Sequence, residues 1–123
     1  MAYITAVEFA YLFGVMELDQ LTDKGNTGTP AYEGFNCAVG TATALIDNAC
    51  ASRYVLPVTK TALIVQIAGD IARYYLYDDA PSGAVVDRYR DALKLLDDIK
   101  VGKLSVDGTE LLPIDTAKKP TGK

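Results

Sequence analysis

The segment that most restricts how this chain can fold is the predicted helix at residues 62–79, ALIVQIAGDIARYYLYDD. Its apolar side chains recur at helical spacing, but they cover more than one face of the helix. A helix of this kind has to be covered on several sides, so we expect it at the centre of a bundle or beneath another subunit. Thr61, directly before it, is a suitable N-terminal cap.

The N-terminal part of the chain predicts a short helix, a break and a further helical stretch. Thr5 and Glu8 have the spacing of a capping box, which marks the start of a helix. Gly14 should stop or bend this helix, and residues 15–21 read as one or two further turns. Residues 22–34, TDKGNTGTPAYEG, contain three glycines and a proline and therefore predict a long exposed loop.

Two more helices complete the predicted bundle. Apolar residues at helical spacing extend from Asn36 to about Tyr54, and Pro57 ends this helix because it restricts the residue before it to extended geometry. Ser82 caps a final amphipathic helix that runs to about Lys100. The predicted fold class is therefore mainly α, a compact four-helix-type bundle with a long loop after the first helical region.

The C-terminal part of the chain has a different sequence pattern. Residues 107–108, Asp-Gly, lie between two short segments, within residues 104–111, in which apolar and polar residues alternate. This pattern is typical of a β-hairpin. The residues that follow lack any apolar period and predict an extended or disordered arm. We therefore divide the chain into a helical domain, residues 1–106, and a C-terminal arm, residues 107–123, with a short hairpin or an extended conformation.

Size and charge limit the classes of protein that fit this chain. With 123 residues it forms one domain, because a second core would need about 50 residues of its own. The formal net charge of −4 argues against a nucleic-acid binder, which needs a dense basic surface. The N-terminal stretch MAYITAVEFAYLF has no basic region before it and contains Glu8, so we expect neither a signal peptide nor a membrane span. A soluble, intracellular protein is expected.

The residue inventory predicts no catalytic, cofactor or metal site. Histidine is absent, which removes Ser–His and Cys–His nucleophile pairs, imidazole zinc ligands and histidine acid–base catalysis. Cys37 and Cys50 lie about 20 Å apart along one predicted helix, too far for a disulfide between them. Gly25 and Gly28 lack the spacing of a phosphate-binding loop.

Asp70 and Arg73 stand out as charged residues within the apolar central helix. Three residues apart, they can pair on one face, and their apolar neighbours would bury them. One interpretation makes Asp70 a general base in an enzyme or ligand-binding site that also contains Tyr77. We favour the other interpretation, a structural ion pair that fixes the register of the bundle, because no second acid or nucleophile lies nearby. The chain is therefore predicted not to be an enzyme.

Candidate contact residues come from the tyrosines, the last helix and the arm. Tyrosine combines a large apolar area with a polar tip, which suits surfaces that become buried on assembly, although each tyrosine could equally pack in the core. The charged outer face of the last helix is a second candidate. It could contact a different face of a neighbouring copy, as the subunits of a ring do. The candidate residues are Tyr32, Tyr74, Tyr77, Arg88, Arg90, Leu111, Leu112 and Ile114.

Four stretches in this order resemble the phage Mu-like family of small virion proteins: FGVMELDQLTD, ALIDNACASRYVLPV, DIARYYLYDD and RYRDALKLLDDIKVGKLSV. The resemblance extends over residues 3–106. The chain departs from the family pattern directly before the central helix, where family members often carry a further proline and this chain has none. This family is related to the helical head–tail connector, or adaptor, proteins of tailed phages.

The resemblance implies a structural virion protein at the head–tail interface, made in the host cytoplasm. Such subunits form a ring, commonly of about a dozen copies, that binds the portal protein on one rim and a tail, stopper or tail-terminator protein on the other. Genome DNA passes through the ring without sequence-specific binding, and no catalytic residue, cofactor or membrane contact comes with the family. The loop and the arm are expected to make many of the contacts with neighbours and portal.

A small DNA-binding regulator of phage origin is the alternative function. It would need a recognition helix rich in basic and amide side chains, and the last helix carries Arg88, Arg90 and Lys94. Asp87 and Asp91 are interleaved with them and would repel phosphates. Salt-dependent retention on heparin would distinguish the regulator from the connector.

Overall fold

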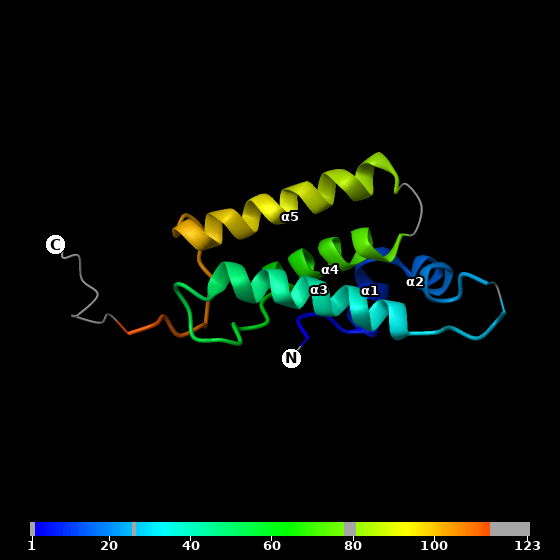
Figure 1. The fold of residues 1–123 in the computed structure, drawn as a ribbon, viewed down its shortest axis with the longest axis horizontal. Coiled ribbons are helices and arrows are strands. Elements are labelled where there is room, and N and C mark those ends of the chain that lie inside the picture. Colours follow the sequence, from blue (N-terminus) through cyan, green and yellow to red (C-terminus); the bar gives the residue numbers. More distant parts are fainter. Residues whose placement is uncertain (1, 26, 78–80, 114–123) are drawn as a thin grey trace.

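A computed structural model of the protein describes residues 2–25, 27–77 and 81–113, and this part of the chain forms five helices (Figure 1). The predicted mainly α fold is confirmed, and the described residues contain no strand. The three longer helices follow the long axis of the molecule, while the two short ones lie toward one end. The helices are α1 (Ala6–Phe13), α2 (Val15–Thr22), α3 (Glu33–Cys50), α4 (Ala62–Leu76) and α5 (Gly83–Val101).

The predicted signals at helix starts are confirmed. Thr5 and Glu8 form the capping box of α1, in which each side chain accepts a hydrogen bond from the backbone N–H of the other residue. Gly14 separates α1 from α2 with a φ of 100°, a conformation that favours glycine. Thr61 and Ser82 cap α4 and α5 through their side-chain oxygens. These boundaries are set by residues that are close together in the sequence.

The central position predicted for α4 is also confirmed. This helix packs against α1, α3 and α5, and Figure 1 shows it between α3 and α5. Burial of its apolar side chains on several sides contributes much of the hydrophobic stabilisation of the bundle. Its fully buried side chains include Ile64, Ile67, Ala68, Ile71 and Ala72.

At Gly69, side chains of α1 and of the residues before it approach α4 closely. A Cβ atom added at Gly69 would lie 3.1 Å from Ile4 Cδ1 and 3.1 Å from Phe13 Cε2. Gly40, on the exposed side of α3, would have no such neighbour within 4 Å among the described residues. The two glycines therefore form a matched pair, one in a close contact and one in open space.

We expect Gly40→Ala to raise the free energy of unfolding by up to about 1 kcal/mol, because alanine is the better helix former. Gly69→Ala should be less stable than Gly40→Ala by at least about 1 kcal/mol, since Ile4 and Phe13 have to move to admit the methyl group. Urea unfolding followed by circular dichroism measures both variants. Equal stabilisation by the two substitutions would contradict the close contact at Gly69.

The hairpin that was one of the two conformations predicted for residues 104–111 is not confirmed. A turn is present at residues 107–108, but the segment after it pairs with the backbone that follows α3. The Val55 N–H donates to the Glu110 carbonyl at 2.8 Å, and the Leu112 N–H donates to the carbonyl of residue 53 at 2.9 Å. The backbone that pairs with this segment thus comes from the α3–α4 connection and not from the neighbouring residues of the chain.

The same pairing explains why α3 ends at Cys50, earlier than the predicted end near Tyr54. The backbone N–H groups of Arg53 and Tyr54 both donate to the Cys50 carbonyl, at 3.0 and 2.9 Å, which closes the helix in a turn. Tyr54 then forms an antiparallel bridge with Leu111, and its hydroxyl accepts a hydrogen bond from the Val106 N–H at 3.0 Å. Contacts with distant residues therefore override the local helical pattern.

The remaining predictions on organisation concern the loop, the arm and the cysteines. The loop between α2 and α3 is present, whereas of the arm only residues 107–113 belong to the described part of the chain. Cys37 is exposed and Cys50 is buried, and both are free thiols. Within the described residues, no helix has the length and apolar character needed to cross a membrane.

Candidate assembly surfaces

Arg73 pairs with a residue of α2. A pair with Asp70 was predicted from the sequence. Its Nε and Nη2 atoms donate to the two carboxylate oxygens of Glu17, at 2.6 and 2.9 Å. This bidentate geometry matches a guanidinium to a carboxylate and joins α4 to α2. The predicted pair was wrong because the two side chains face different neighbours. Arg73 forms its bonds with Glu17 of α2, whereas the Asp70 carboxylate accepts a hydrogen bond from Gln66 and is influenced by the charges of both Arg88 and Arg73.

Two aromatic residues complete the cluster around Arg73. The guanidinium carbon lies 4.5 Å from the centroid of the Phe13 ring, and the Tyr77 hydroxyl donates to Glu17 at 3.2 Å. The hydrogen bonds to Glu17 raise the pKa of Arg73, while burial and then the charge of Glu17 raise the pKa of Tyr77. Tyr77, predicted as a contact residue, therefore takes part in a cluster within its own chain.

Asp70 is buried in α4, with 7% of its surface exposed. Its carboxylate accepts a hydrogen bond from Gln66 Nε2 at 3.0 Å. Burial raises the pKa of Asp70, and the hydrogen bond and the charges of Arg88 and Arg73 offset part of that effect. A general base also needs an opening that admits a substrate. The hollows described below are lined by other residues, and Asp70 borders neither of them.

Tyr74 belongs to a cluster of three tyrosines that joins α4 to α5. Its ring stacks on that of Tyr89, with centroids 3.9 Å apart and an angle of 6° between the planes. Tyr75 meets both rings edge-on, and its hydroxyl lies 3.1 Å from the Tyr89 hydroxyl. This hydrogen bond, followed by burial, raises the pKa of Tyr89 to about 12. Tyr75, which is not among the candidate contact residues, keeps 45% of its surface exposed.

The other predicted contact residues lie on separate parts of the surface. Arg88 and Arg90 are exposed on α5. Tyr32 precedes α3, is 40% exposed and meets the Phe35 ring edge-on at 6.2 Å. The structure therefore does not bring these residues together into one site.

Leu111 and Leu112 share one end of the molecule with Val55 and Leu56. The backbone hydrogen bonds between residues 53–55 and 110–112 hold these apolar residues close together. Their exposed fractions are 55% and 39% for the two leucines of the arm, and 37% and 40% for Val55 and Leu56. We call these four residues the arm-end patch. Ile114, the last predicted contact residue, lies outside the described residues.

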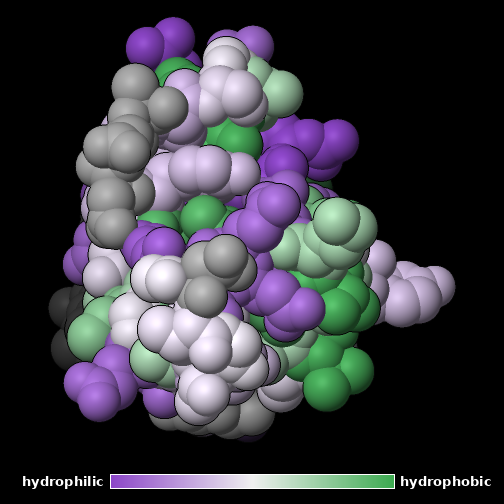
Figure 2. Space-filling model, turned by 90° about the vertical axis from the view of Figure 1, so that its right-hand side faces the viewer, coloured by the Kyte–Doolittle hydropathy of each residue, from purple (hydrophilic) through white to green (hydrophobic). Residues whose placement is uncertain are grey.

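A second apolar surface lies on the two short helices. It consists of Val7 and Tyr11 on α1, which are 79% and 90% exposed, and Val15 and Met16 on α2, which are 62% and 76% exposed. We call these residues the α1–α2 patch. Figure 2 views the molecule from the end that carries α2 and shows hydrophobic residues gathered toward one side. An adjoining groove of about 470 Å³ is lined by Val7, Glu8, Tyr11, Leu12, Lys60, Ala62 and Val65.

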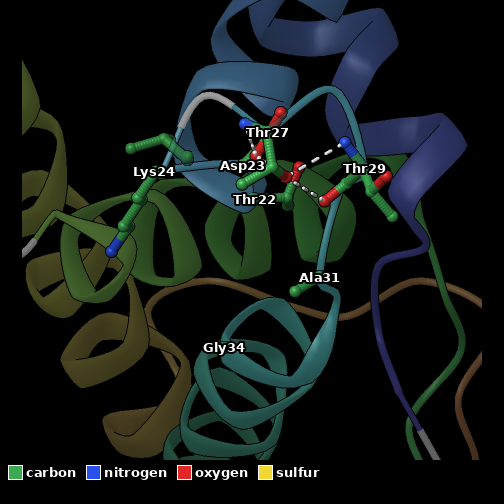
Figure 3. A pocket seen from close by; sticks show the side chains of 9 residues that line it. Thr22, Asp23, Lys24, Thr27, Thr29, Ala31 and Gly34 are labelled. Atoms are coloured by element: carbon green, nitrogen blue, oxygen red, sulfur yellow. Dashed lines mark hydrogen bonds between the residues drawn. The ribbon is translucent and has the colours of Figure 1, made fainter.

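The loop between α2 and α3 borders a hollow of about 370 Å³ (Figure 3). The Asp23 carboxylate accepts hydrogen bonds from the Thr27 N–H at 2.9 Å, the Thr27 hydroxyl at 2.9 Å and the Gly28 N–H at 2.7 Å. The bonds from Thr27 lower the pKa of Asp23 and fold the loop on itself. No group of three potential metal-ligating side chains is present among the described residues.

These observations describe a small helical protein with exposed apolar surface. Its half-buried polar clusters tie its own helices together, whereas eight of its exposed apolar side chains lie in the two patches defined above. Exposed apolar surface of this kind marks sites of contact with other proteins.

The chain belongs to the family described as "Bacteriophage Mu, Gp36", whose model matches residues 3–120. It is also 30% identical over 105 residues to "Gene product J" of Escherichia phage Mu, a match that covers 84% of this chain and 74% of the phage protein. The predicted resemblance to a phage Mu-like family is thereby confirmed.

Proposed function

We propose that this protein is a structural virion protein that acts as a head–tail connector. It assembles as a ring beneath the portal protein, carries a tail, stopper or tail-terminator protein on its other rim, and leaves a channel for genome DNA. It folds in the host cytoplasm and resides at the head–tail interface of the virion. Membership of a bacteriophage Mu family supports this setting.

The observation that carries the proposal is the presence of two different exposed apolar patches on one small bundle. A closed ring requires contacts between unlike faces of neighbouring copies, and the two patches offer such faces. The formal net charge of −4 is compatible with a channel that conducts DNA, because a strongly basic lining would hold the DNA in place.

Size-exclusion chromatography with light scattering tests the proposal, on the purified chain alone and with the portal protein of the same phage. Rings, or several copies of the chain recruited to each portal, are expected. A monomer that ignores the portal would contradict the proposal. Salt-dependent retention on heparin would instead favour the DNA-binding regulator.

Deleting residues 107–123 is expected to abolish docking on the portal and to leave the bundle folded. The contacts between helices do not involve this segment, so the helical signal in circular dichroism should be retained. A matched variant that lacks only residues 114–123 keeps the bonds between residues 53–55 and 110–112 and should dock detectably. Unimpaired docking after the longer deletion would refute this role of the arm.

A further inference from the structure

We propose that α2 is a hinged strap, which opens from the end of α4 as a unit while the rest of the bundle stays folded. The strap is the segment of residues 15–22, and its latch is the set of hydrogen bonds that the Glu17 carboxylate accepts from Arg73 and Tyr77. This inference goes beyond the proposed function, because it concerns a single chain and does not depend on assembly.

The hinge of the strap is Gly14. Its backbone has a φ of 100° and a ψ of 146°, a conformation that glycine adopts far more readily than other residues. A Cβ atom added there would meet no atom of the described residues within 4 Å, so close packing does not require the glycine. The chain can therefore change direction at Gly14 without disturbing a packed side chain.

The strap has little buried surface of its own. Of the eight residues of α2, Leu18, Leu21 and Thr22 are the buried ones, and the Thr22 hydroxyl donates to the Leu18 carbonyl within the same helix at 2.7 Å. Among the described residues, no side chain caps the start of α2. An isolated helix of this length is at best marginally stable in water, so α2 depends on its contacts with the rest of the chain.

Polar side chains link this segment to the last turn of α4. Glu17 accepts hydrogen bonds from Arg73 at 2.6 and 2.9 Å and from the Tyr77 hydroxyl at 3.2 Å. Directly after the strap, Lys24 Nζ donates to the Leu76 carbonyl at 2.6 Å. Hydrogen bonds depend on both distance and angle, so a rotation of α2 about its hinge breaks these contacts together. The latch is therefore either closed or open.

Opening of the strap would change the exposed apolar surface of the molecule. Val7 and Tyr11 of the α1–α2 patch precede the hinge at Gly14, while Val15 and Met16 follow it. The two halves of the patch keep their relative positions only while the latch is closed. The strap thus allows the fold to divide or rejoin this surface without unfolding the bundle.

Native-state hydrogen exchange on the purified full chain tests the strap. The amides of residues 18–22 should exchange at least about tenfold faster than those in the middle of α4, because a smaller opening exposes them. Arg73→Ala removes the latch and should speed exchange at residues 18–22 by at least about tenfold. Unchanged exchange of α2 in this variant would show that the latch does not hold the strap and would overturn the proposal.

Leu96→Ala is the matched comparison, because it leaves a cavity at a buried position of α5, a helix that packs against α3 and α4. It should speed exchange in α4 by at least about tenfold and change exchange at residues 18–22 by less than about threefold. Equal acceleration of both helices would mean that α2 opens only with the whole bundle, which would also overturn the strap.

Circular dichroism establishes that each variant is folded. If Leu96→Ala does not fold, low concentrations of urea applied to the unsubstituted chain make the same comparison. Urea should then speed exchange in α4 more steeply than in α2, because the opening of the strap exposes less surface than complete unfolding does. Equal urea dependence in the two helices would contradict a separate opening of α2.

Discussion

Arg73→Ala is expected to lower the free energy of unfolding by about 3 kcal/mol. The substitution leaves the Glu17 carboxylate without its cation and removes the guanidinium that lies 4.5 Å from the Phe13 ring. Loss of one partner from a buried pair costs about 3–5 kcal/mol, and the residual exposure of these two side chains, 18% and 19%, places the value at the lower end. Urea unfolding at pH 7 measures the change.

A double-mutant cycle separates the ion pair from the packing of Arg73 on Phe13. Glu17→Gln removes the charge but keeps the shape, so the coupling energy between positions 17 and 73 should be at least about 1 kcal/mol. The more exposed pair between Lys60 and Glu8 serves as the control, and Lys60→Ala should cost less than about 1 kcal/mol. Strictly additive effects of the Glu17 and Arg73 substitutions would show that the pair itself contributes nothing.

Features governed by neighbouring residues could be predicted from the sequence. The capping box of Thr5 and Glu8, the break at Gly14 and the caps at Thr61 and Ser82 depend on side chains within one turn of the backbone that they bind. The central place of α4 followed from its composition, because a helix that is apolar on several faces has to be covered on several sides.

Features governed by distant residues could not be predicted in this way. Glu17 and Arg73 are separated by 56 positions, so proximity in the sequence favoured Asp70, whose carboxylate instead accepts a hydrogen bond from Gln66 of its own helix. The segment after residues 107–108 likewise has the local pattern of a hairpin, yet it pairs with the backbone around Val55. In both cases the local pattern identified a group that needs a partner and not the partner itself.

The sequence likewise does not reveal which apolar side chains lie on the surface. Periodicity places Val7 and Phe9 in one helix, but only the structure shows that Phe9 is the buried residue of α1 while Val7 and Tyr11 face outward. A pattern of apolar residues thus reports that a helix has apolar faces without saying which of them its own domain covers. The faces left uncovered are the ones that assembly has to explain.

Tyr3→Phe is expected to lower the free energy of unfolding by about 2 kcal/mol. Tyr3 is fully buried, and its hydroxyl donates to Asp47 at 2.5 Å and accepts from the buried Val58 N–H at 3.0 Å. Phenylalanine fills the same space but leaves this N–H without its partner, which is the costly part of the change. Tyr11→Phe, at a site that is 90% exposed, is the control and should stay within about 0.5 kcal/mol of the unsubstituted protein.

Tyr3 also makes the stability of the fold sensitive to alkaline pH. Burial, together with the hydrogen bond to Asp47, raises the pKa of Tyr3 from 10 to about 12. The folded state therefore holds this proton more tightly than the unfolded state, and the resulting stabilisation is complete below pH 10 and is lost as the pH rises through 12. Tyr3→Phe should make the free energy of unfolding decline less steeply across this pH window. Part of the decline should remain in the variant, because Tyr89 also has a pKa of about 12 in the folded state. A decline as steep in the variant as in the unsubstituted protein would mean that Tyr3 ionises at no cost to the fold, contrary to its burial and its bond to Asp47.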